Sequence, residues 1–218
     1  QKGLSEEKFE MEIEGGLEKD EATFKAALDK KAKEDLAKLE SAGLDEKLVS
    51  ALKPRIAQEG MMLTQYYNQK VAAKKVEGST APSFDYENHK GGKTKLEDLR
   101  GKYVYIDVWA TWCGPCRAEI PHLKKIEEKY HGKNIEFVSI SVDVDKDHEK
   151  WQKFVTEKQL GGTQLFADKN WMSDFIKAFG INSIPRFILI DPNGNVVKAD
   201  APRPSSATLV ELLDGLVK

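Results

Sequence analysis

Residues 103–116 read YVYIDVWATWCGPC, and this stretch decides the fold. Its first half, Tyr103–Trp109, is an almost continuous run of aromatic and β-branched residues, which predicts a strand buried on both faces. The tetrad Cys113-Gly114-Pro115-Cys116 follows and contains both cysteines of the chain. We expect a helix to begin at the cysteines and to extend to about residue 130. The cysteines therefore lie where a buried strand gives way to a helix.

Two cysteines three positions apart favour redox chemistry over a structural role. A disulfide across so short a loop adds little stability, because the chain-entropy effect grows with loop length. At a helix start, amide donors and the helix dipole favour a thiolate at Cys113, which can attack a substrate disulfide. Cys116, one turn inside the helix and less exposed, then resolves the mixed disulfide. The alternatives are a structural disulfide or half of a zinc site, although structural zinc usually takes four protein ligands.

Two acidic residues near the cysteines are candidates for proton transfer. Asp107 is the only charged residue within the predicted strand 103–109. Burial without a partner would penalise its ionised form and raise its pKa, which would suit a base acting on Cys116. The alternatives are an aspartate at a solvated sheet edge or one paired with a lysine. Glu119, three residues past Cys116, either acts electrostatically on the thiols or is a solvated surface acid.

The composition divides the chain into two segments. Residues 1–78 are rich in Lys, Glu, Ala and Leu, and the helical spacing of their apolar residues predicts a hairpin of helices at 20–41 and about 45–75. Pro54 and Gly60 should kink or split the second helix. Small and helix-breaking residues then mark a boundary before the second segment.

The second segment, residues 79–218, predicts a mixed sheet with helices on both faces. Pro185, at the entrance of a strand, is either a cis-proline in a special turn or an ordinary strand-entry proline. Asp191-Pro192-Asn193-Gly194 is a strong hairpin signal between two strands. The expected strands are 103–109, 135–142, 163–166, 186–190 and 195–199, with helices after the cysteines, around Trp151, around Phe175 and over 206–217.

The bulk composition excludes some classes of function. A formal net charge of −2 argues against a nucleic-acid partner, which requires a basic excess or a clustered basic face. No run approaches the roughly 18 apolar residues of a membrane-spanning helix. The four histidines are scattered and indicate no metal site. The chain begins with Gln1 rather than Met, so we expect a preceding extension that would carry any export signal or lipid anchor.

Three sequence blocks, in the correct order, resemble thioredoxin-fold proteins of the TlpA/ResA type, which are related to the AhpC/TSA and redoxin proteins. The resemblance covers about residues 81–218 and implies a thioredoxin fold with a helix–strand insertion at about 143–170. The helical segment 1–78 has no counterpart in the minimal fold. The blocks are Trp109–Pro121, then Ala81–Phe84 with Gly92-Lys93, Leu96, Leu99 and Gly101-Lys102, and finally Gly180–Pro185 with the following strand and Gly194.

The resemblance also implies roles for individual residues. Asp107 occupies the place of the buried acid of thioredoxin, where many TlpA-like proteins carry a neutral residue. Glu119 occupies the position of an active-site glutamate of ResA-like members. The other implied roles are Cys113 as nucleophile, Cys116 as resolving thiol, Pro185 as the cis-proline facing them, Ile184 as a backbone partner of an extended substrate, and Trp112, Gly114 and Pro115 as further substrate contacts.

Taken together, the residues and the resemblance predict an extracytoplasmic thiol–disulfide oxidoreductase of the periplasm or cell envelope. The Gly-Pro dipeptide is that of thioredoxin and favours a reductant. Its partners would be proteins that contain disulfides and an upstream thiol protein that donates electrons, and no metal or organic cofactor is implied. One alternative is an isomerase or oxidase whose N-terminal helices dimerise or shape a substrate cleft. Another is a non-enzymatic protein that binds a partner through those helices.

Overall fold

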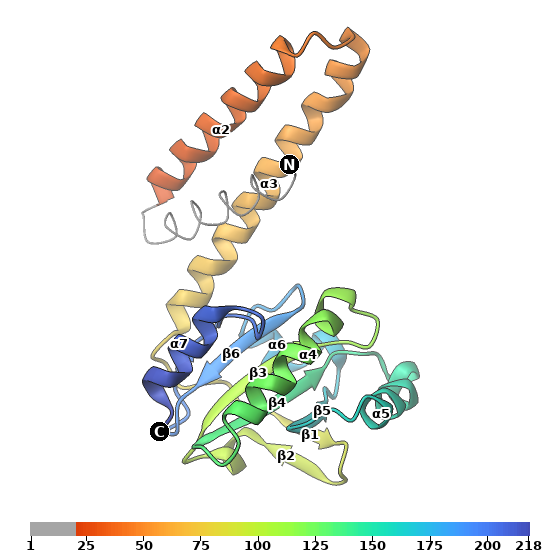
Figure 1. Cartoon of the computed structure of the whole chain (residues 1–218), viewed down its shortest axis with the longest axis vertical. Coiled ribbons are helices and arrows are strands. Elements are labelled where there is room, and N and C mark those ends of the chain that lie inside the picture. The colour runs from red at the N-terminus through yellow and green to blue at the C-terminus, as the bar shows by residue number, and fades with distance from the viewer. Residues whose placement is uncertain (1–20) are drawn as a thin grey trace. The chain divides into compact units, whose positions relative to one another are not determined.

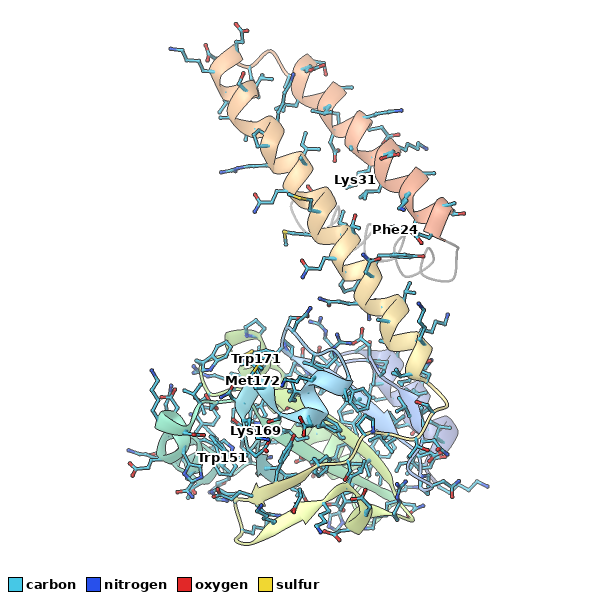
Figure 2. All side chains as sticks on the ribbon, turned by 180° about the vertical axis from the view of Figure 1, so that it is seen from behind. Phe24, Lys31, Trp151, Lys169, Trp171 and Met172 are labelled. Carbon is cyan, nitrogen blue, oxygen red and sulfur yellow. A yellow bond between two sulfur atoms is a disulfide. The ribbon has the colours of Figure 1, made fainter. Side chains whose placement is uncertain are left out.

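Helices α2 (Glu21–Ser41) and α3 (Glu46–Val76) form an antiparallel hairpin in the computed structural model, which describes residues 21–218 (Figure 1). The ring of Phe24 stacks on that of Tyr67, with centroids 4.0 Å apart, and Figure 2 shows Phe24 directed toward α3. Lys31 also forms an ion pair with Glu59 across the hairpin. The expected helix start at residue 20 lies outside the described residues.

Helix α3 corrects one expectation from the sequence. Pro54 and Gly60 were expected to kink or split this helix, yet α3 is a single uninterrupted element. Proline removes the hydrogen bond to the carbonyl four residues earlier, that of Ser50, but both residues are exposed and water can satisfy that group. A glycine within a helix costs only about 1 kcal/mol relative to alanine. The prediction of a split was therefore wrong.

A seven-stranded mixed sheet follows, in the order β2-β1-β5-β4-β3-β6-β7. Strand β3 is central, because it pairs in parallel with β4 and antiparallel with β6. Strands β4 and β5 are also parallel, whereas β1, β2 and β7 join antiparallel. The strands are β1 (Asp85–Asn88), β2 (Lys93–Lys95), β3 (Tyr103–Trp109), β4 (Ile135–Ser141), β5 (Thr163–Phe166), β6 (Arg186–Ile190) and β7 (Val196–Lys198).

Helices cover both faces of this sheet (Figure 1). Helices α4 (Gly114–Lys129) and α7 (Ala207–Leu216) pack on the face that carries Tyr105. Helices α5 (His148–Glu157) and α6 (Asp174–Ala178) contribute to the core on the other face. Three short 3₁₀ helices, at Leu96–Leu99, Asp145–Asp147 and Asn170–Met172, complete the unit; Figure 2 labels Met172. The predicted mixed sheet with flanking helices, including the inserted α5 and β5, is confirmed.

The chain divides into two compact units between residues 71 and 72. The last residues of α3 therefore belong to the second unit. Ala73 is 6% exposed within the core of the second unit, and Val76 packs against that core. The amide of Gly78 donates to the carbonyl of Val196, 2.7 Å away. These contacts lie before the boundary at residue 78 that the composition indicates.

We predict that a fragment of residues 72–218 is more stable than one of residues 79–218. The shorter fragment loses the buried surface of Ala73 and Val76 and the Gly78 hydrogen bond, which together contribute about 1–3 kcal/mol. Urea unfolding of both fragments in the oxidised form measures the difference. Equal unfolding free energies would show that the domain boundary lies at 78, as the composition alone suggests.

Candidate active site

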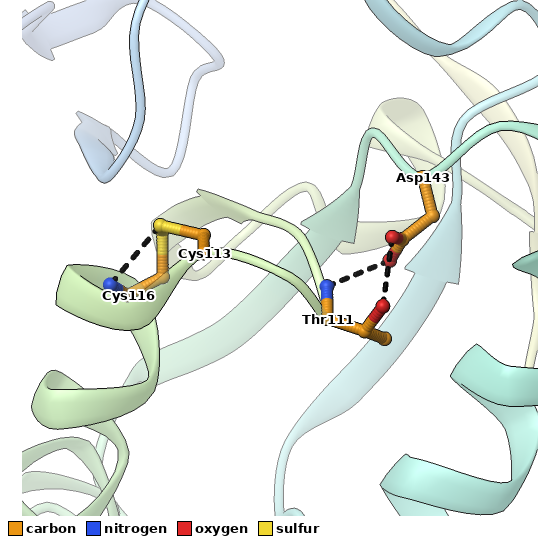
Figure 3. Close-up of a disulfide and its surroundings, with 4 residues drawn as sticks. All are labelled: Thr111, Cys113, Cys116 and Asp143. Atoms are coloured by element: carbon orange, nitrogen blue, oxygen red, sulfur yellow. Dashed lines mark hydrogen bonds between the residues drawn. A yellow bond between two sulfur atoms is a disulfide. The ribbon is translucent and has the colours of Figure 1, made fainter.

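A disulfide joins Cys113 and Cys116 at the start of α4 (Figure 3). Cys113 is the N-cap residue of this helix, and its Sγ accepts a hydrogen bond of 3.1 Å from the amide of Cys116. Pro115 lies in the first turn, where its missing N–H leaves no carbonyl unsatisfied. In the reduced form, the same amide and the helix dipole would stabilise a thiolate at Cys113. The local geometry therefore distinguishes the two sulfurs chemically.

Exposure does not distinguish the two cysteines, contrary to expectation. Cys113 was expected to be exposed and Cys116 buried, yet they are 4% and 3% exposed in this oxidised form. The side chain of the neighbouring Trp112, in contrast, is 54% exposed. Because the two sulfurs are bonded to each other, neither can turn toward solvent without the other. The chemical difference between the two cysteines therefore comes from the hydrogen bond to Cys113 and not from exposure.

A buried carboxylate holds the segment that leads into the dithiol. Asp143, just after β4, accepts hydrogen bonds from the amide and the hydroxyl of Thr111, each 2.9 Å long (Figure 3). It also accepts one from the hydroxyl of Ser141, at 2.7 Å. Hydrogen bonds to a charged acceptor are stronger than those between neutral groups. The carboxylate of Asp143 therefore fixes the turn between β3 and α4.

Asp107 is buried in the middle of the central strand, at 7% exposed. Burial, together with the charges of Glu119 and Glu127, raises the pKa of this carboxyl group to about 8. The alternative of a solvated sheet edge is therefore wrong, and the charges that act on Asp107 are carboxylates rather than a lysine. A carboxyl group with this pKa can exchange a proton near neutral pH.

Glu119 is buried rather than solvated, at 8% exposed. Its carboxylate accepts hydrogen bonds from the amide and the hydroxyl of Ser205, both 2.9 Å long. The guanidinium of Arg203 lies 4.0 Å from the same carboxylate. The surface-acid alternative was wrong because the segment between β7 and α7 covers this position. Through its charge, Glu119 acts on Asp107.

The peptide bond between Ile184 and Pro185 is cis, which confirms the predicted cis-proline and excludes the alternative of an ordinary strand-entry proline. This bond immediately precedes β6, the neighbour of β3 in the sheet. The side chain of Ile184 packs against the core cluster that contains both cysteines. Gly114 and Pro115 are exposed beside the disulfide. Substrate contact by these residues stays a prediction.

Sequence reasoning missed Glu127, an ionisable residue on the inner face of α4. Burial raises the pKa of its carboxyl group to about 7. Helical spacing could have found it, since Cys116, Ile120, Leu123 and Glu127 follow the i, i+4, i+7, i+11 pattern of one helix face. It was overlooked because a glutamate on a helix is usually solvated. Thr111 and Asp143 were missed because nothing in their spacing shows that two loops meet.

A dithiol that caps the helix after the central strand of such a mixed sheet is characteristic of thioredoxin-fold thiol–disulfide oxidoreductases. Comparison with known proteins agrees. The AhpC/TSA family model matches residues 78–199, more than half of the chain, and the protein belongs to that family. Its match to ResA proteins places it among the TlpA/ResA-like members of the thioredoxin superfamily.

Individual relatives support the same conclusion. The chain is 30% identical to the thiol-disulfide oxidoreductase ResA of Bacillus cereus over 71% of its own length and 86% of that protein. A solution structure from Bacteroides vulgatus, described as a thiol-disulfide oxidoreductase, is 48% identical with a TM-score of 0.56, covering 63% of this chain and 90% of the other. A crystal structure from the same organism, described likewise, is 37% identical with a TM-score of 0.59, covering 66% and 99%. The thioredoxin fold and the thiol–disulfide oxidoreductase activity are thereby confirmed.

We predict that Asp107→Asn makes the oxidised protein more stable at neutral pH. Between about pH 4 and about pH 8 the folded state retains a proton on Asp107 that the unfolded chain has released, so stability falls as pH rises. This effect reaches up to about 1.4 kcal/mol per pH unit, and the variant lacks it. Urea unfolding at about pH 5 and about pH 7 measures the change in slope.

The matched control is Asp145→Asn, which removes an exposed carboxylate from the same unit. This control should follow the pH dependence of the wild type. If Asp107→Asn also follows it, the pKa of Asp107 is not raised in the folded protein.

Proposed function

We propose that this protein reduces disulfides of extracytoplasmic proteins through Cys113 and Cys116. The observation that carries the proposal is the hydrogen bond from the amide of Cys116 to the Sγ of Cys113 at the start of α4. It supports Cys113 as the attacking thiolate, because a stabilised thiolate is the reactive form of the dithiol. The Gly-Pro dipeptide between the cysteines, shared with thioredoxin, favours the reducing direction.

The reaction consists of two exchange steps. The thiolate of Cys113 attacks one sulfur of the substrate disulfide, forming a mixed disulfide and releasing the first substrate thiolate. Cys116 then gives up its proton to Asp107 and attacks the Sγ of Cys113, releasing the second substrate thiolate. Two electrons pass to the substrate, and the Cys113–Cys116 disulfide is the oxidised product. An upstream thiol protein must reduce this disulfide before the next turnover.

The extracytoplasmic location is carried over from the resemblance to ResA-type proteins. The proposed compartment is the periplasm or cell envelope, where protein disulfides form and a reductant depends on an outside source of electrons. Within residues 21–218, none of the helices has the length and apolar character needed to cross a bilayer.

We predict that Cys116→Ser traps a substrate on Cys113. Without the resolving thiol, the mixed disulfide persists, and mass spectrometry of the purified adduct identifies the attached protein. The control is Cys113→Ser, which retains the other thiol and should capture little. If the two variants capture the same proteins in equal amounts, Cys113 is not the nucleophile.

We predict a reduction potential for the Cys113/Cys116 pair close to that of thioredoxin, about −270 mV. A value close to that of DsbA, about −120 mV, would contradict the proposed reductase and indicate an oxidase. The gap corresponds to about 7 kcal/mol, at about 1.4 kcal/mol per 30 mV, so the measurement separates the two clearly. Equilibration with glutathione or dithiothreitol buffers provides the potential.

A further inference from the structure

A row of three buried polar side chains crosses the centre of the sheet. Asp107 on β3 pairs in register with Ser139 on β4, and Ser139 pairs with Gln164 on β5. All three residues are buried. Residues paired directly across adjacent strands direct their side chains to the same face of a sheet. A polar row therefore crosses a sheet whose adjoining positions are mostly apolar.

A small cavity lies between this row and α4. Its volume of ≈ 10 Å³ is close to the minimum that one water molecule requires. Among the described residues, four buried side-chain atoms lack a hydrogen-bond partner, and three belong to residues that line this cavity: Asp107 Oδ1, Trp109 Nε1 and Gln164 Oε1. One donor and two acceptors match the usual three hydrogen bonds of a buried water. The cavity is thus suited to a single water molecule.

Glu127 connects this cavity with solvent. It lines the cavity together with Asp107, and it also lines a second, open cleft with Lys102 and Lys133. Its carboxylate lies over the glycine pair that precedes β5: a Cβ added at Gly161 would lie 2.2 Å from Glu127 Oε2. Only a residue without a side chain leaves this space for the carboxylate. The fold therefore places an ionisable group between Asp107 and bulk water.

The charges around Glu127 permit it to accept and release protons near neutral pH. Burial raises the pKa of its carboxyl group to about 7; Lys124 lowers it and Glu136 raises it. The pKa of Asp107, about 8, is close enough for a proton to pass either way. Glu119 also acts on Asp107, but both of its oxygens accept hydrogen bonds from Ser205. The other ionisable groups that line the open cleft with Glu127 and Glu136 are Lys102, Tyr130, His131, Lys133 and Lys218.

We propose that Glu127 exchanges the proton of Asp107 with solvent through one water molecule in the cavity between them. The inference rests on the proposed dithiol function. Near neutral pH Asp107 holds a proton and must lose it before it can accept the thiol proton of Cys116. The proton of Asp107 moves through the water to the carboxylate of Glu127 and leaves into the open cleft. The thiol proton of Cys116 then passes to the ionised Asp107 as Cys116 attacks Cys113, and no electrons move in the proton-transfer steps.

Glu127→Gln tests the relay because it keeps the shape of the side chain and removes the exchangeable proton. Reduced protein is mixed with an equimolar amount of dithiobisnitrobenzoate, which releases one coloured thiolate when Cys113 attacks and a second when Cys116 resolves. We expect the second phase to slow about tenfold in Glu127→Gln, with the first phase unchanged. Glu128→Gln, an exposed neighbour on α4, is the matched control and should leave both phases unchanged.

Two further variants separate a relay from a general effect of charge. Gly161→Ala keeps the charge of Glu127 but displaces its carboxylate, and should slow the second phase as Glu127→Gln does. In Glu127→Ala the second phase should accelerate with added formate at constant ionic strength, because formate replaces the missing carboxylate. Equal second-phase rates in Glu127→Gln and Glu128→Gln, or no response of Glu127→Ala to formate, overturn the relay. Absence of a second phase in the wild type would instead overturn the proposed dithiol function.

Discussion

The hydrogen bond from the amide of Cys116 to the sulfur of Cys113 depends on how β3 passes into α4. Strand β3 is held on both sides, by β4 and by β6, so its end is fixed within the sheet. The carboxylate of Asp143 then fixes Thr111 in the turn that follows. A helix start held this firmly offers its free amides to one sulfur only. The sheet thus determines which sulfur receives the amide of the helix, and this supports the proposal that Cys113 is the nucleophile.

The region between the sheet and α4 contains acidic groups that lower the stability of the fold. Asp107 and Glu127 both have carboxyl groups with raised pKa values, and burial is the main cause for each. A buried, unpaired carboxylate costs free energy that an apolar side chain of the same size would not. Proton transfer near neutral pH requires this elevation of the pKa. Burial therefore lowers the stability of the fold and at the same time brings the pKa values of these carboxyl groups into the range that proton transfer requires.

Strong local patterns made most of the fold predictable. The apolar run at 103–109 and the amphipathic helix after the cysteines coincide with β3 and α4. Strands β1 and β2 were not predicted from their residues, because both are short and β2 (Lys93–Lys95) is polar and lacks an apolar alternation. Of the candidate site, the cysteines, the cis-proline and the burial of Asp107 could be inferred. The burial of Glu119 could not, since it depends on the distant segment around Ser205.

The position of Glu127 relative to Cys116 shows how closely one helix constrains both parts of the site. The two residues are 127 − 116 = 11 positions apart, about three turns at 3.6 residues per turn, so they share one face of α4. Inserting a single residue between them would rotate Glu127 by about 100° and remove it from the cavity. The N-terminus of α4 must remain at the dithiol, and its inner face must remain over β3 and β5. The register of this helix, rather than any single contact, keeps Cys116 and the proposed proton path through Glu127 on the same face of α4.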